Sequence, residues 1–85
     1  MKVKVLYFAS VREKLGKNVE EIDLPPGVAT VAGLRNHLRS RGGAWADALA
    51  ENMLLRTAVN QDMIQAGASI KAGDEIAFFP PVTGG

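Results

Sequence analysis

Cysteine is absent from the sequence, and histidine occurs only once among its 85 residues. Without cysteine, the chain has no disulfide, no thiolate nucleophile and no cysteine-based metal site. The single histidine, His37, has no partner at the spacing of a metal site or a catalytic triad, so we interpret it as a surface residue. We therefore expect no bound metal or cofactor, and a fold held together by packing alone, which suits a reducing compartment.

An excess of either charge and a long apolar segment are also missing. Ten lysines and arginines face nine aspartates and glutamates, which gives a net charge of +1. Proteins that bind nucleic acid usually carry a basic stripe, so we expect no nucleic-acid partner. No segment approaches the roughly 20 apolar residues of a membrane span. The apolar run at the N-terminus is too short for a signal peptide, and Arg12 and Glu13 follow it, so we expect a cytoplasmic protein.

Four segments have the pattern of β-strands. Residues 2–8 alternate so that Val3, Val5 and Tyr7 share one face. Proline and glycine at 25–27 end the second predicted strand, because proline cannot donate to a ladder and glycine accommodates a turn. Polar turns are predicted at 60–62 and 71–74. The remaining strands are predicted over residues 19–24, 54–59 and 75–79.

The main helix is predicted to follow Thr30, which is a suitable N-cap residue. Its apolar side chains recur at steps of three and four residues, which places them on one stripe: Val31, Leu34 and Leu38. The pair Gly42-Gly43 is the stop signal for this helix. A helix with one apolar stripe between strands is expected to cover one face of a sheet.

Two shorter helices are also predicted. In the first, Ser10 and Glu13 have the spacing of a capping box, and Gly16 can end the helix. The second, over residues 44–51, would bury three apolar side chains, those of Trp45, Ala48 and Leu49. The order of elements indicates an α+β fold with one main helix packed on a small mixed sheet. This order fits the ubiquitin-like β-grasp, in which the first and last strands lie side by side at the centre.

The C-terminus is the most informative segment. The last predicted strand stops at Pro80-Pro81, which cannot continue a sheet and which hold the backbone extended. We therefore divide the chain into a domain over 1–79 and a tail over 80–85, which can reach about 20 Å at most. Gly84 and Gly85 have no Cβ atom, so the end of the tail can thread a narrow channel. A frayed terminus is the alternative, and the stiff proline stem argues against it.

Several segments resemble the small subunits of molybdopterin synthase. The resemblance is most specific at the tail, over 78–85 with Gly73-Asp74-Glu75 before it, and it extends to residues 5–9, 11–13 and 58–61. It implies a ubiquitin-like β-grasp fold and a role as a sulfur carrier without catalytic side chains. An ATP-dependent activating enzyme would adenylate the carboxylate of Gly85, which would then become a thiocarboxylate. The large subunit would use that sulfur to build the dithiolene of molybdopterin on a cyclic pyranopterin precursor.

A surface for the large subunit is predicted beside the tail. Phe8 and Phe79 alternate with the buried positions of their strands, and Met63, in the loop after Asn60, could join them. An exposed apolar patch on a small protein usually marks a partner site. The alternative is a second small core under the 61–72 loop, and both interpretations stay open at this point. The tail residues that would contact the partner are Pro80, Pro81, Val82 and Thr83.

Three other functions are compatible with the sequence. A sulfur carrier of the thiamine pathway would have the same fold and tail, although the Phe-Phe-Pro-Pro-Val-Thr stem favours the molybdopterin carrier. A ubiquitin-like modifier would join its C-terminus to lysines of target proteins. An interaction module would have an inert tail.

Overall fold

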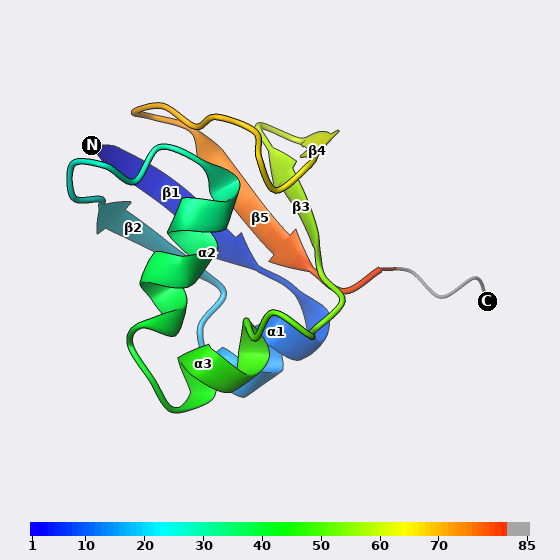
Figure 1. Ribbon diagram of the computed structural model, residues 1–85. Coiled ribbons are helices and arrows are strands. Elements are labelled where there is room, and N and C mark those ends of the chain that lie inside the picture. The colour runs from blue at the N-terminus through cyan, green and yellow to red at the C-terminus, as the bar shows by residue number, and fades with distance from the viewer. Residues whose placement is uncertain (82–85) are drawn as a thin grey trace.

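The computed structural model describes residues 1–81, which form one mixed sheet and three helices (Figure 1). The sheet contains five strands in the order β2-β1-β5-β3-β4. The elements follow one another along the chain as β1 (Lys2–Tyr7), α1 (Ala9–Leu15), β2 (Val19–Asp23), α2 (Val31–Arg39), α3 (Ala44–Ala48), β3 (Arg56–Val59), β4 (Asp62–Ile64) and β5 (Glu75–Phe79).

The first and last strands lie side by side within the sheet, as in the β-grasp that the order of elements fits. β1 and β5 run parallel, with Val5 opposite Ile76 and Tyr7 opposite Phe78. β2 pairs antiparallel with β1, and β3 pairs antiparallel with both β5 and β4. A parallel central pair with antiparallel strands on both sides and a helix across one face is the β-grasp arrangement, so the predicted fold class is confirmed.

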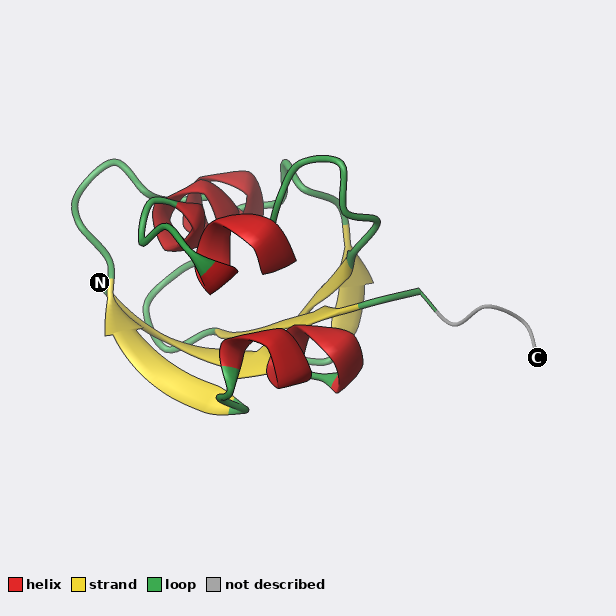
Figure 2. Cartoon of the chain, turned by 90° about the horizontal axis from the view of Figure 1, so that it is seen from below, coloured by secondary structure: helices red, strands yellow, loops and turns green. Residues whose placement is uncertain are grey.

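One face of the sheet carries the core. α2 lies across this face (Figures 1 and 2), and its predicted stripe is fully buried. Thr30 is the N-cap of this helix, because its hydroxyl accepts a hydrogen bond of 3.0 Å from the backbone N–H of Gly33. Alternate residues of β1 and β5 meet α2 in the same cluster, among them Val5, Tyr7 and Phe78. The alternation predicted for these two strands therefore places their buried faces correctly.

The capping box predicted for the first helix is wrong. α1 begins at Ala9, and its N-cap is Phe8, which makes no side-chain capping hydrogen bond. Ser10 is already inside the helix, so its hydroxyl does not lie where an N-cap accepts a bond. The predicted end is confirmed: Gly16 adopts the left-handed conformation, with φ of 67°, and its N–H donates to the carbonyl of Arg12.

Two predicted elements are shorter in the structure by two or more residues, whereas β1 and β2 each end one residue before the predicted end. α3 ends at Ala48 instead of residue 51, and β3 begins at Arg56 instead of residue 54. The guanidinium of Arg35 satisfies three backbone carbonyls in the segment between them, because it donates hydrogen bonds to Leu49, Ala50 and Met53. Ala48 and Leu49 are buried as predicted, whereas Trp45 is only half-buried.

β4 was missed by the sequence analysis, which placed residues 61–72 in a loop. Asn60 and Gln61 both have positive φ angles, 51° and 72°, and form the tight turn that returns the chain beside β3. The strand has only three residues, too few for an alternating pattern to be recognised. β4 forms one edge of the sheet, which brings Met63 next to Ala58.

Candidate functional site

The tail leaves the protein from the centre of the sheet. Phe78 is completely buried, and its carbonyl accepts a hydrogen bond of 3.2 Å from the N–H of Phe8. Phe79, Pro80 and Pro81 are half-buried. Because β5 is paired on both sides, the base of the tail is anchored to an interior strand of the sheet. The other predicted tail residues, Val82, Thr83, Gly84 and Gly85, lie outside the described residues.

The face of the sheet opposite α2 carries the aromatic residues that the sequence singled out. Phe8 is 44% exposed and Met63 is 55% exposed, so the 61–72 segment does not enclose them in a second core. Phe79 follows the buried Phe78 and therefore points to this open face, where it is partly covered. The role of these three residues in binding a partner stays a prediction.

An apolar row crosses the whole sheet on this open face. The strand registers align one apolar residue from each of the five strands. Residues aligned across neighbouring strands present their side chains on the same face, so the five form a continuous stripe. In spatial order the row consists of Val19, Leu6, Ala77, Ala58 and Met63.

Alternation within β1 and β5 places Leu6 and Ala77 on this face, but no local pattern indicated that Val19 and Ala58 would join them. Alternation within each strand was the available signal, but it does not say which residues of separate strands lie opposite each other. Only the register joins them into one stripe.

Charged residues bound the apolar row on one side. Lys4 is aligned with Glu21 of β2 and with Glu75 of β5. On the other side of the row, Phe79 is aligned with Arg56. The open face therefore changes from paired opposite charges at one end of the strands, through the apolar row, to Phe79 and the cation of Arg56 at the end where the tail begins.

A cluster of charged and hydrogen-bonded side chains lies on the helix side of the sheet and serves the fold. The Tyr7 hydroxyl donates to Glu20 Oε1 at 2.7 Å, and Arg41 donates to the same oxygen at 2.8 Å. Burial and the bond to Glu20 raise the pKa of Tyr7. Burial would also raise the pKa of Glu20, but hydrogen bonds from Tyr7, Arg41 and Lys17 outweigh it and lower that pKa. The Arg41 guanidinium also lies 4.3 Å from the ring centre of Trp45.

The buried carboxylate of Asp74 fixes the turn before β5. Its two oxygens accept bonds from the Asn60 side chain at 3.0 Å and from the Lys71 N–H at 2.9 Å. The hydrogen bond from Asn60 lowers the pKa of Asp74 most, and the bond from the Lys71 N–H lowers it further. Because both oxygens are occupied within the fold, we assign Asp74 a structural role in aligning β3 and β5.

Neither a metal site nor a membrane segment is found in residues 1–81. This part of the chain contains no group of three or more metal-binding side chains. No helix in it has the length and apolar character needed to cross a bilayer. His37 is half-buried on α2 and stands apart from the apolar row.

The fold and the site together define a ubiquitin-like β-grasp protein with an apolar face beside a glycine-terminated tail. The chain matches the ThiS family over residues 5–85. It is 47% identical to the molybdopterin synthase sulfur carrier subunit of Haemophilus influenzae, and the match covers 98% of this chain and 99% of that protein. The chain therefore belongs to the ThiS family, within the group of molybdopterin synthase sulfur carrier subunits.

Two solved structures show the same fold. The small archaeal modifier protein 1 of Haloferax volcanii aligns with a TM-score of 0.74 at 26% identity, over 95% of this chain and 98% of that one. A chain from the complex of subunits 1 and 2 of the molybdopterin-converting factor of Helicobacter pylori aligns with a TM-score of 0.67 at 23% identity, with both chains fully covered. The fold is thus common to proteins with different names, and it does not by itself decide the function.

Proposed function

We propose that this protein is the sulfur carrier subunit of a cytoplasmic molybdopterin synthase. The observation that carries the proposal is the 47% identity to a carrier subunit over nearly the full length of both chains. The Gly84-Gly85 terminus and the apolar face beside the tail support it. In this role the chain has no catalytic side chain. Residues 1–79 are the domain by which partners recognise it, and residues 80–85 are the arm that carries the reacting group.

The reacting group is the α-carboxylate of Gly85. A carboxylate is a poor acyl electrophile, so the activating enzyme uses ATP to form an acyl-adenylate and releases pyrophosphate. A sulfur nucleophile then displaces AMP from the carbonyl carbon and leaves a thiocarboxylate. The thiocarboxylate sulfur is the nucleophile that the large subunit transfers to the pyranopterin precursor to build the dithiolene. Since the chain contains no cysteine, it offers sulfur no other obvious covalent attachment.

The large subunit docks, in this proposal, on the open face of the sheet. Phe8, Met63 and Phe79 are its aromatic and apolar contacts, and the row from Val19 to Met63 extends them across the sheet. Burial of exposed apolar groups favours association, and a few aromatic side chains usually supply most of that free energy. Pro80 to Thr83 then lead the tail into the active site of the partner as a stiff stem, and Gly84 passes its narrowest part.

Mass spectrometry of the protein purified from cells tests this proposal. We expect part of the protein to carry sulfur in place of one oxygen at the carboxylate of Gly85, and loss of the gene to abolish molybdoenzyme activity. A thiocarboxylate together with a thiamine requirement on gene loss would instead identify the thiamine-pathway carrier. An unmodified tail under all conditions would contradict both.

A protein modifier is the second candidate, because the Haloferax modifier protein has the same fold at 26% identity. A modifier would be recovered as conjugates, joined through Gly85 to lysines of other proteins. Denaturing purification of the tagged protein distinguishes the two functions: a carrier is recovered as the free chain, whereas a modifier is recovered as a ladder of larger species.

A further inference from the structure

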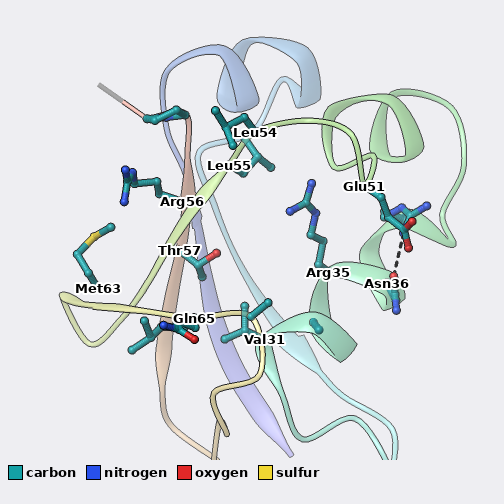
Figure 3. A pocket seen from close by; sticks show the side chains of 15 residues that line it. Val31, Arg35, Asn36, Glu51, Leu54, Leu55, Arg56, Thr57, Met63 and Gln65 are labelled. Carbon is teal, nitrogen blue, oxygen red and sulfur yellow. Dashed lines mark hydrogen bonds and ion pairs between the residues drawn. The ribbon is translucent and has the colours of Figure 1, made fainter. Parts of the chain in front are cut away.

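A groove opens on the opposite side of the tail base from the apolar row. It has a volume of about 600 Å³ and lies between α2, the segment that leads into β3, and β4 with the residues that follow it. Figure 3 shows Arg35 reaching from α2 into this groove, with Leu54 and Leu55 near one end. Pro81, the last described residue of the tail, also lines it. A molecule in this groove would therefore touch the stem of the tail.

The walls of the groove carry an excess of positive charge. Arg35, Arg39 and Arg56 line it, and Glu51 is the one acidic residue among the lining residues. Burial and the neighbouring charge of Arg39 lower the pKa of Arg35, and Glu51 acts in the opposite direction. The two arginines thus repel each other, and an anion placed between them would relieve the repulsion.

Arg39 is also incompletely paired. Its Nη1 atom contacts Asn36 at 2.9 Å and Glu51 at 3.4 Å, whereas its buried Nε atom has no hydrogen-bond partner within residues 1–81. Arg35, in contrast, has a structural task, because three backbone carbonyls of the segment before β3 accept its hydrogen bonds. The cations available to a ligand are therefore those of Arg39 and Arg56.

The rest of the groove is apolar. Leu54 is 78% exposed, the highest exposure among the large apolar side chains of the described residues, and Leu55 and Ile64 are partly buried beside it. An exposed leucine next to arginines suits a segment that carries both apolar and acidic side chains. Arginine pairs well with carboxylates because its planar fork can donate two parallel bonds.

A phosphate ligand fits this groove less well. Phosphate groups are commonly held by the free amides at a helix N-terminus. The first amides of α2 are already bonded: Val31 donates to Ala68 at 3.0 Å, Ala32 donates to Ala66 at 2.9 Å, and Gly33 is bonded to the Thr30 side chain. The positive charge of the groove thus comes from side chains alone, as in a surface that recognises acidic peptide segments.

The groove is continuous with the apolar row around the β3–β4 edge. Met63 is the last residue of the apolar row and also lines the groove. Arg56 likewise belongs to both surfaces, because it is aligned with Phe79 and lines the groove. We propose that the groove is a second docking surface, occupied by an extended acidic and apolar segment of the large subunit, so that this partner holds the tail base from both sides. The inference rests on the proposed function, because the large subunit is the partner that receives the tail.

Binding measurements with the purified large subunit and the full chain test the inference. The groove variant is Arg39→Gln, because Arg56 also lies beside Phe79 on the open face, and the matched control is Arg12→Gln, which removes the same charge from an exposed position of α1. We expect the groove variant to bind the large subunit about tenfold more weakly and with a smaller dependence on salt, and the control to bind like the wild type. Leu54→Ser, which changes no charge, should weaken binding as well. Thermal melts should show that all variants remain folded.

The outcomes separate the inference from the function on which it rests. Wild-type protein that fails to bind the large subunit would contradict the proposed function itself. Wild-type binding that is weakened by Phe79→Lys, but that is equal in the groove variant and its control, would overturn only the inference. If the groove variant binds normally but is no longer adenylated, the inference is also wrong and the occupant of the groove is the activating enzyme. A wild-type chain that dimerises through the groove would equally overturn it.

Discussion

The two faces of the sheet use neighbouring residues for opposite purposes. Phe78 is completely buried against α2, whereas Phe79, the next residue, lies on the open face at the base of the tail. One face gains stability by excluding water within the chain, whereas the other leaves apolar groups exposed to water. Under the proposed function, stability depends on one face and partner binding on the other, so substitutions on the two sides should have separable effects.

The largest effect is expected at the tail, where function should be lost without loss of stability. Removal of Gly85 shortens the arm by about 3.5 Å, and a misplacement of about 1 Å can already reduce a rate a hundredfold. We expect no sulfur transfer in synthase activity reconstituted with the activating enzyme, ATP and a sulfur donor, while the melting temperature stays unchanged. One alanine added after Gly85 should be equally inactive because it converts the reacting carboxylate into an amide. Full activity of the shortened protein would refute the carrier function.

On the helix-covered face, Phe78→Ala should reduce stability by about 3–5 kcal/mol, since the side chain is completely buried and would leave a cavity. The matched variant on the open face, Phe79→Ala, should reduce it by about 1 kcal/mol or less. Urea denaturation followed by circular dichroism measures both values. Equal losses at the two positions would show that the open face contributes to the core as much as the covered face does.

On the open face, substitutions should affect the affinity for the large subunit more than they affect stability. Phe79→Lys is expected to weaken association with the large subunit by about 2 kcal/mol or more, which is typical of an aromatic anchor. The isolated domain should remain folded, and isothermal titration against the large subunit gives the affinity. A variant that unfolds without a separate binding defect would place Phe79 in the core and would contradict the assignment of the two faces.

A smaller effect is expected from the charged cluster at the edge of the covered face. The pKa of Glu20 is lowered in the fold from its ordinary value of 4.5, so its stabilising effect is present above that pH and is lost as the pH falls through the lower folded-state value. Glu20→Gln should reduce stability by about 1–2 kcal/mol at neutral pH, because it weakens bonds to Tyr7 and Arg41. Denaturation at pH 7 and pH 3 should show the difference between wild type and variant shrinking in acid.

The smallest effect is expected from metal. Because residues 1–81 contain no cluster of metal-binding side chains, neither zinc nor a chelator should change the melting temperature of the protein. A large shift in differential scanning calorimetry would reveal a contribution to folding that packing does not supply.

The sequence alone determined the elements whose signals are local. Alternation fixed which residues of β1 and β5 are buried, and the spacing of Val31, Leu34 and Leu38 fixed the inner side of α2. The tail could also be predicted from the sequence, because its stiff proline stem and its two glycines act through backbone properties and not through contacts. These local signals, together with the resemblance of the tail to small subunits of molybdopterin synthase, indicate the family without any tertiary contact.

Only the tertiary structure decided what depends on residues far apart in the sequence. Arg35 donates hydrogen bonds to carbonyls between α3 and β3 that follow it by 14 to 18 residues, and no local pattern in the sequence predicts such bonds. The three residues of β4 become a strand because a turn with two positive φ angles returns them to β3. The apolar row forms because the strand registers align one apolar residue from each strand. The groove forms because α2 packs close to β4. Register and approach are set by the packing of the whole domain, which periodicity within one segment does not contain.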